Sequence, residues 1–306
     1  MENMTALVSC FARAYHYRNN SEWVFADEFA GKLLTEEEYA SISRHMSGGI
    51  AFFAPGFAGT AEEALRFIVD RQLAPSVLAR SAFCERAMEN AVMLGCGQVV
   101  VFACGYDTSS LRGRQEALSV FELDWPEMIE DRKGRAARAG LQAVCRVEDI
   151  GCDLSRPDWK DKLIQAGFDG NATAFGSLLG ISYYLTADEF TSLIGGISAL
   201  WREGSSLCFD YPLSEGGAES ERNRALAAAA GEGMKARYTY DEMEALLAAA
   251  GFLIHEHLNA GEATEAFFSA YNRKNPEHAM TAPAGVGYCL AVKKYAESPC
   301  GMKNRA

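Results

Sequence analysis

The hydrophobic positions of this 306-residue chain fall into short β-branched runs that alternate with longer segments of helical period. The clearest run, 98–102 (QVVVF), is continuous and stops at a turn of small residues, which is typical of a parallel strand buried on both faces. A second run, within 119–126, has the same character and ends in acids. Further runs predict strands at 143–149, within 172–185, and at 205–212, 253–258 and 288–294. The order of these elements indicates an α/β fold with a doubly wound, mostly parallel, seven-stranded sheet.

Segments with a helical period precede, separate and follow these strands. In the first of them Phe11, Ala14 and Tyr15 fall on one face. Several threonines begin capping boxes, because each has a glutamate three positions later. They are Thr35, Thr60, Thr186 and Thr239. Residues 65–94 predict one long helix or a helix kinked at Pro75. Further helices are predicted at 127–140, 218–231 and 242–250.

Helical patterns dominate the chain ahead of the first strand. We therefore expect one elaborated domain in which a helical N-terminal cap, 1–94, covers a Rossmann-like core, 95–306. Within the cap, 46–59 is rich in glycine and aromatic residues and fits neither a helix nor a strand. It is either a lid that excludes water from a reacting centre or a loop packed permanently on the core.

The turn after the first strand and the acids that end the second predict a ligand that contains a nucleoside. Asp124 lies 19 residues after Gly105, about the spacing at which such a unit places a carboxylate for ribose hydroxyls, and Glu122 is beside it. The turn lacks the glycines of G-x-G-x-x-G, and Asp107 repels a pyrophosphate but attracts a cation such as a sulfonium. This favours S-adenosyl-L-methionine over NAD. An ordinary βα turn with solvated acids is the alternative interpretation.

At these residues the chain resembles the leucine carboxyl methyltransferase family. VVVFACGYDTSSLR followed by VFELDWP is similar to a strand, a G-x-G-x-D-T-x-x-x-R turn and an E-[VIL]-D-x-P strand end. Upstream, ADEFAGKLL and VLARSAFCERAMENAV resemble the family's DPxAxxLL segment and ARTRxxDDxLxxA helix. Downstream, CDLSRPDW and LLGISYYLTADEF resemble VDLRDDW and EGLLMYLPPEA. The matches run in family order from 26 to 190 and imply the class I methyltransferase variant of the Rossmann-like fold.

The resemblance implies roles for further residues. Arg80 matches the arginine that clamps the methionine carboxylate of the cofactor, which suits a planar guanidinium. Asp153 matches an acid that accepts a hydrogen bond from the exocyclic amine of adenine, and Leu154 follows it against the ring. Helix capping is the alternative for Asp153. Tyr183 and Tyr184 stand where the family places residues beside the substrate, and packing in the core is their alternative.

Two positions depart from the family pattern. Ala103 replaces the first glycine of the turn, a change that a loop can absorb, so we still expect it to contact the cofactor. Leu179 replaces a glutamate that the family places near the cofactor's amino group or the acceptor. The identity of the methyl acceptor is therefore left open. A carboxylate acceptor needs no base, whereas a phenol or an alcohol does. The candidate bases are His16, His45, Tyr183 and Tyr184.

Composition narrows the choice of partners. A formal charge of -12 argues against nucleic acid or an anionic membrane, because both require a basic surface. We see neither a transmembrane stretch nor a secretory signal. Nine cysteines without C-x-x-C spacing fit reduced thiols, so we expect the cytoplasm. His255 and His257 share a strand face, but no third ligand is evident and no metal is predicted.

The leading hypothesis is a cytoplasmic S-adenosyl-L-methionine-dependent O-methyltransferase. Its acceptor is a carboxylate or hydroxyl of a small molecule, as in the family branch linked to polyketide-type metabolites. One alternative is a NAD-type oxidoreductase, which the single-glycine turn disfavours. The other is a non-catalytic binder on the same fold, suggested by Leu179 and Ala103. The oligomeric state, monomer or homodimer, is left open.

Overall fold

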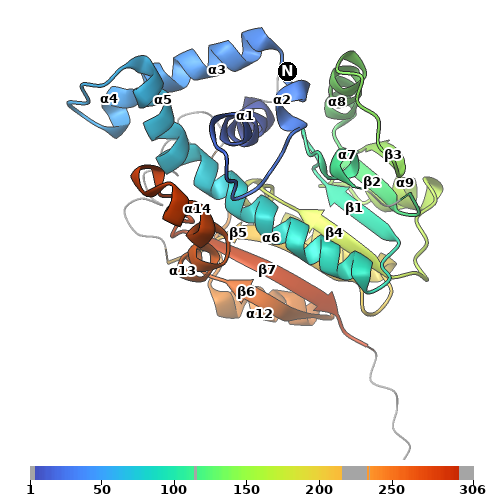
Figure 1. Ribbon diagram of the computed structural model, residues 1–306. Helices are drawn as coiled ribbons and strands as arrows, with labels where there is room; N and C mark the ends of the chain where they lie inside the picture. Colours follow the sequence, from blue (N-terminus) through green and yellow to red (C-terminus); the bar gives the residue numbers. More distant parts are fainter. Residues whose placement is uncertain (1–3, 114–115, 216–232, 234, 296–306) are drawn as a thin grey trace, which may run out of the picture.

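The computed structural model describes residues 4–113, 116–215, 233 and 235–295 of the chain. Within these residues seven strands form one sheet in the order β3-β2-β1-β4-β5-β7-β6 (Figure 1). The strands are β1 (Gln98–Phe102), β2 (Ser119–Asp124), β3 (Arg146–Gly151), β4 (Ala174–Leu178), β5 (Ser206–Pro212), β6 (Phe252–Leu258) and β7 (Val286–Lys293). Strands β1 to β5 pair in parallel, and β7 runs antiparallel to β5 and β6. The predicted doubly wound, mostly parallel, seven-stranded sheet is confirmed.

Two strand boundaries differ from the prediction for identifiable reasons. β3 begins at Arg146 rather than at 143, because its pairing with β2 starts opposite Ser119. β4 ends at Leu178, well before the end of the predicted segment, since Gly180 adopts a φ of 70° that a strand cannot continue. A short 3₁₀ helix, η2 (Ser182–Tyr184), follows.

The helices begin where the sequence places capping signals. All four predicted threonine capping boxes are confirmed. The described helices are α1 (Met4–Asn19), α2 (Ala30–Leu33), α3 (Glu36–Gly48), α4 (Ile50–Phe53), α5 (Ala61–Ile68), α6 (Ala74–Met93), α7 (Ser109–Arg112), α8 (Pro126–Arg138), α9 (Trp159–Gln165), α10 (Ala187–Leu200), α12 (Tyr240–Ala249), α13 (Ala260–Ala263) and α14 (Ser269–Lys274). Two shorter turns, η3 (Thr264–Phe268) and η4 (Pro276–His278), flank α14. The predicted helix at 218–231 lies outside the described residues. The expectation that 46–59 is not helical is wrong for its first half, which contains the end of α3 and all of α4.

The segment 65–94 is neither one continuous helix nor a simple kink. A π turn, η1 (Val69–Leu73), joins α5 to α6, and Pro75 lies in the first turn of α6. Proline has no N–H to donate, and its ring collides with the carbonyl four residues earlier, at Arg71. The wider π turn accommodates this loss, and residues 70–73 line a cavity described below.

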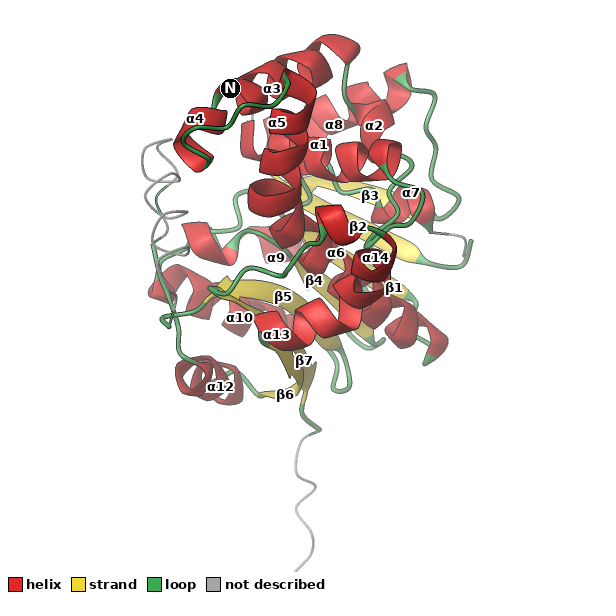
Figure 2. Ribbon diagram, turned by 60° about the vertical axis from the view of Figure 1, so that its left-hand side comes forward, coloured by secondary structure: helices red, strands yellow, loops and turns green. Residues whose placement is uncertain are grey.

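Two hydrophobic layers enclose the sheet, because successive side chains of a strand point to opposite faces. Val99 and Val101 of β1 pack with α1, α6 and α8, whereas Val100 and Phe102 pack with α9, α10 and α12. Helices therefore cover both faces of the sheet (Figure 2). This three-layer arrangement leaves the ends of the strands as the place where a ligand can approach.

The N-terminal helices pack against the sheet side that carries α6 and α8 (Figure 1). Phe11, Ala14 and Tyr15 of α1 are buried, as their shared face predicts. Glu38 of α3 binds Arg135 of α8 through two hydrogen bonds of 2.8 Å. These contacts hold the N-terminal region against the rest of the molecule.

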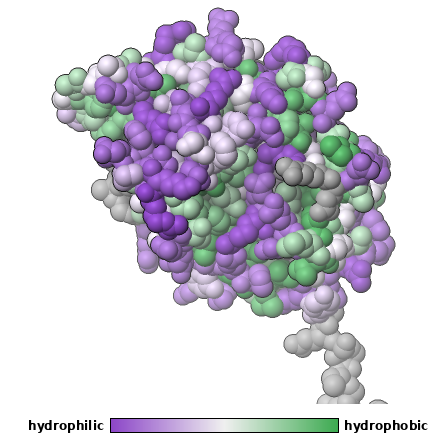
Figure 3. Space-filling model, in the orientation of Figure 1, coloured by the Kyte–Doolittle hydropathy of each residue, from purple (hydrophilic) through white to green (hydrophobic). Residues whose placement is uncertain are grey.

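Hydrophilic side chains dominate the molecular face seen in Figure 3, and hydrophobic ones form smaller patches. Among the described residues no helix has the length and apolar character that crossing a bilayer requires. The eight cysteines of this part of the chain are free and buried.

Candidate active site

A cavity of about 510 Å³ opens at the carboxyl ends of the central strands. In sheets of this kind ligands bind where the strand order reverses, which here is between β1 and β4. The predicted site residues that line this cavity are Arg80, Ala103, Gly105, Asp107, Asp124, Asp153, Leu154 and Tyr184. The fold thus brings together residues that are far apart in the sequence.

The turn after β1 has an unusual backbone. Ala103 and Gly105 both adopt left-handed conformations, with φ of 52° and 49°. For a residue with a side chain this costs about 1–2 kcal/mol, and alanine carries the smallest side chain. The turn therefore keeps a left-handed geometry even though one glycine of the family pattern is missing.

Asp124 is fixed at the end of β2 by the same turn. Its Oδ2 accepts a hydrogen bond of 2.7 Å from the Gly105 N–H, and its Oδ1 accepts one of 2.7 Å from the Trp125 N–H. Burial raises the pKa of Asp124 above its ordinary value, although these two bonds act in the opposite direction. A carboxylate has about four acceptor positions, so an oriented pair remains for hydroxyl donors in the cavity.

Glu122 lies elsewhere, although it shares a strand face with Asp124. It is fully buried and accepts hydrogen bonds from Arg132 (2.6 Å from Nη2 to Oε1) and from Ser110 (2.7 Å). The described lining of the cavity does not include it. Glu122 lies two residues before the end of the strand and faces Arg132 of α8 rather than the cavity. We therefore leave Glu122 out of the proposed cofactor contacts.

Asp107 and Asp153 shape the two loops that flank the cavity. Asp107 Oδ1 accepts a hydrogen bond of 2.7 Å from the Ser109 N–H, and Asp153 Oδ1 accepts one of 2.9 Å from the Ser155 N–H. Both are turns closed by an aspartate side chain, which fixes the loop backbone. The N-cap position of α9 belongs to Asp158 rather than to Asp153.

Arg80 of α6 reaches the cavity beside a buried carboxylate that sequence analysis did not assign to the site. Its Nη1 lies 3.7 Å from Oδ2 of Asp210, which is 1% exposed at the end of β5. Asp210 also accepts hydrogen bonds from the Gly180 N–H (2.7 Å) and the Tyr183 hydroxyl (3.0 Å). A Cβ at Gly180 would lie 2.7 Å from Arg80 Nη1, so only glycine leaves the guanidinium its place. The sequence signal that could have identified Asp210 was its position as an acid near the end of the predicted strand 205–212.

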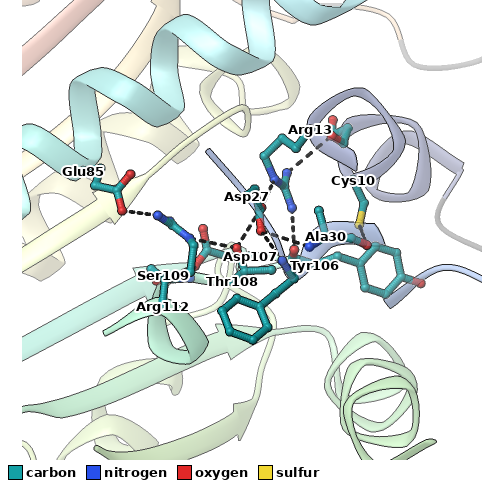
Figure 4. Close-up of polar contacts among 12 residues, drawn as sticks. Cys10, Arg13, Asp27, Ala30, Glu85, Tyr106, Asp107, Thr108, Ser109 and Arg112 are labelled. Carbon is teal, nitrogen blue, oxygen red and sulfur yellow. Dashed lines mark hydrogen bonds and ion pairs between the residues drawn. The ribbon is translucent and has the colours of Figure 1, made fainter. Parts of the chain in front are cut away.

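Figure 4 shows a second group that sequence analysis missed, where Arg13 and Asp27 of the N-terminal region meet the turn after β1. Arg13 lines the cavity. It donates one hydrogen bond from Nε to Asp27 (2.8 Å) and another from Nη2 to the Tyr106 carbonyl (2.6 Å). Asp27 also accepts a hydrogen bond of 2.8 Å from Thr108. A lone arginine in the first helix gives no signal in the sequence, because only the fold brings it to the turn.

The four candidate bases separate clearly. Tyr184 lines the cavity, whereas Tyr183 is directed to Asp210, and burial with this carboxylate raises the Tyr183 pKa. Burial lowers the pKa of His16 to about 3, and His45 contacts the Ser41 carbonyl on α3. Neither histidine is among the described residues that line the cavities.

A second cavity, of about 750 Å³, adjoins the first. The two share the residues Thr5, Ser9, Arg80, Gly180 and Tyr184. Tyr183 lines only the second cavity, and Leu179 only the first of these two. One space at the strand ends therefore continues into another past Arg80 and Tyr184.

His257, considered above as a metal ligand, contacts a tyrosine hydroxyl. His257 Nε2 lies 2.9 Å from the Tyr211 hydroxyl. In the part of the chain that the structure describes, no three His, Cys, Asp or Glu residues are grouped as metal ligands.

The sheet with helices on both faces, and the cavity where its strand order reverses, define a Rossmann-like α/β protein of the methyltransferase type. Crystal structures of a candidate methyltransferase from Thermobifida fusca (TM-score 0.55, 14% identity, 95% of this chain and 94% of that chain) and of a duf574 family protein from Streptomyces avermitilis (TM-score 0.57, 16% identity, 82% and 97%) share this fold.

The sequence comparisons give the family. The model for leucine carboxyl methyltransferase matches residues 6–198. The Bacillus subtilis protein YktD, named as a candidate S-adenosyl-L-methionine-dependent methyltransferase, is 36% identical over 95% of this chain and 98% of its own length. A Mycobacterium marinum protein named in the same way is 30% identical over 76% of this chain and 72% of its own length. The chain belongs to the leucine carboxyl methyltransferase family, which confirms the resemblance seen in its motifs.

Proposed function

We propose that this protein transfers a methyl group from S-adenosyl-L-methionine to a carboxylate or hydroxyl oxygen of a small-molecule acceptor. Membership of the family carries the enzyme class and the donor: the chain is an S-adenosyl-L-methionine-dependent methyltransferase. The kind of acceptor and the residue roles below are our proposal. The single observation that carries it is the junction of two cavities at Arg80 and Tyr184.

The residues of the first cavity fit the donor part by part. The oriented carboxylate of Asp124 suits the ribose hydroxyls, and the loop of Asp153 and Leu154 suits adenine. The guanidinium of Arg80 suits the methionine carboxylate, and the space that Gly180 leaves beside it supports this role.

The chemistry required of the protein is modest. The bound donor supplies an electrophilic methyl group on a positively charged sulfur, so that a C–O bond forms as the C–S bond breaks and sulfur keeps the electron pair. Holding two reactants in register can contribute about 7–11 kcal/mol to lowering the barrier. The shared wall of the two cavities provides this positioning, with the acceptor in the second cavity.

Tyr183, which lines the second cavity, is unsuited to act as a base, and this favours a carboxylate acceptor. Because burial and Asp210 raise the pKa of Tyr183, its hydroxyl stays protonated at neutral pH. A protonated phenol donates hydrogen bonds and is a poor base. A carboxylate acceptor is already ionised, so it needs no base at all.

The experiment combines binding and turnover. Calorimetry with S-adenosyl-L-methionine, S-adenosyl-L-homocysteine and NAD should show binding of the two sulfur compounds and none of NAD. Release of S-adenosyl-L-homocysteine is then measured with a panel of carboxylic acids and phenols. Binding of NAD alone would support an oxidoreductase, and donor binding without turnover on any acceptor would support a non-catalytic binder.

A further inference from the structure

The second cavity differs in charge from the chain as a whole. Its described lining includes the guanidinium groups of Arg71, Arg80 and Arg237, and its carboxylate is Asp70. That carboxylate is already engaged, with 2.5 Å between its Oδ2 and Nε of Arg66. In a chain with a formal charge of -12, basic residues therefore outnumber acidic ones in this lining.

Arg71 belongs to the π turn η1 and lines this cavity. Residues 70–73 of the turn are all part of the lining. The guanidinium lies 4.8 Å from the ring centroid of Phe67, which supports it from one side. Arg71 is exposed, and its charge acts on the neighbouring Asp70 as well as on a ligand in the cavity.

Gln72 adds an independent requirement. Its Oε1 is buried and has no hydrogen-bond partner in the described part of the chain. Buried polar atoms are nearly always paired, and Gln72 lines the cavity, so a rotation of its amide toward the cavity would give Oε1 a donor from a ligand or a water. An O–H or N–H group of a bound molecule supplies one.

We infer that the methyl acceptor is an organic acid that also carries an O–H or N–H donor. Arg71 binds its anionic group, Gln72 Oε1 accepts its hydrogen bond, and the oxygen that is methylated is a further group lying at the junction beside Tyr184. This inference rests on the proposed function, because it assigns the second cavity to the acceptor.

The test first separates the two levels. Binding of S-adenosyl-L-homocysteine, measured by calorimetry, is required by the proposed function alone. The saturated protein is then titrated with mandelate and mandelamide, salicylate and salicylamide, and malate and malamide. We expect at least one acid to bind about tenfold or more tightly than its neutral amide. Equal affinity within every pair, or no binding by any acid at millimolar concentration, overturns the inference while the donor site stands.

Variants assign the preference to named side chains. Arg71→Gln should abolish the preference for the acid, and Arg71→Lys should retain part of it. Gln72→Leu should weaken mandelate more than phenylacetate, which lacks the hydroxyl. Arg44→Gln, on the exposed part of α3, is the matched control and should change nothing. The affinity for S-adenosyl-L-homocysteine reports folding in each variant, and a full preference in a folded Arg71→Gln protein overturns the inference.

Discussion

Asp27 accepts a hydrogen bond from Thr108 across a fully buried contact, with 2.8 Å between Oγ1 and Oδ2. The same carboxylate oxygen receives Nε of Arg13 at 2.8 Å. Thr108 belongs to the turn after β1, whereas Asp27 and Arg13 belong to the N-terminal region. The helical region ahead of the sheet therefore helps to build the wall of the candidate donor site.

Asp27→Ala should lower the free energy of unfolding by about 3–5 kcal/mol, because it leaves the buried guanidinium of Arg13 without its partner. Denaturant unfolding followed by circular dichroism measures this loss. Glu36→Ala is the control, because this carboxylate is exposed and forms a long ion pair of 3.6 Å with Arg18. It should change the free energy of unfolding by about 0.5 kcal/mol or less. Equal effects of the two variants would show that the buried pair is not a structural anchor.

The free energy of unfolding should depend on pH through the carboxyl group of Glu38. Hydrogen bonds from Arg135 lower the pKa of Glu38 to about 2, below the ordinary value of 4.5. A lowered folded-state pKa gives stability that is fully present above the unfolded pKa and is lost as the pH falls toward the folded one. Allowing for solvent screening, Glu38→Gln should cost about 1 kcal/mol at neutral pH. Unfolding measured between pH values of about 5 and 3 should show the difference from wild type shrinking, and a constant difference would contradict the ion pair.

Asp124→Ala should weaken the binding of S-adenosyl-L-methionine by about 1–3 kcal/mol, the cost of a lost charged hydrogen bond. Calorimetry measures the affinity directly. Glu122→Gln tests the distinction between the two acids of β2, because the cavity lining does not include Glu122. It should lower stability by weakening the pair with Arg132 more than it lowers donor affinity. Unchanged affinity in Asp124→Ala would remove the ribose assignment.

Arg80→Lys should weaken donor binding by about 1 kcal/mol or more, since a point charge cannot replace two parallel hydrogen bonds. Arg202→Lys is a suitable control, because this arginine is exposed and donates to the Asn171 carbonyl. Titration by calorimetry distinguishes the two variants. Wild-type affinity in Arg80→Lys would mean that Arg80 serves only to pair with Asp210.

Ala103→Gly should raise stability slightly. Relief of the left-handed conformation gains about 1–2 kcal/mol. The greater freedom of glycine in the unfolded chain costs about 0.4–1 kcal/mol of this. Thermal unfolding should show a small increase in Tm with donor affinity preserved. A decrease in Tm would contradict the strained turn at φ 52°.

Local patterns were sufficient wherever one strand or one turn decides the outcome. The continuous run at Val99–Val101 and the capping box at Thr35 fixed elements that the structure confirms. The predicted position of Asp124 beside the Gly105 turn also follows from the chain alone, because a strand–turn–strand unit is short. The π turn at 69–73 was not predicted, since Pro75 is compatible with a continuous, a kinked or a locally widened helix.

The sequence by itself determined the sheet, its turn chemistry and the family, because periodicity and short motifs are properties of neighbouring residues. Only the tertiary structure separated Glu122 from Asp124 and brought Arg13 and Asp210 to the site. It also placed a second cavity against the first. These outcomes depend on contacts between segments that are distant along the chain, and no local pattern encodes which of those contacts form.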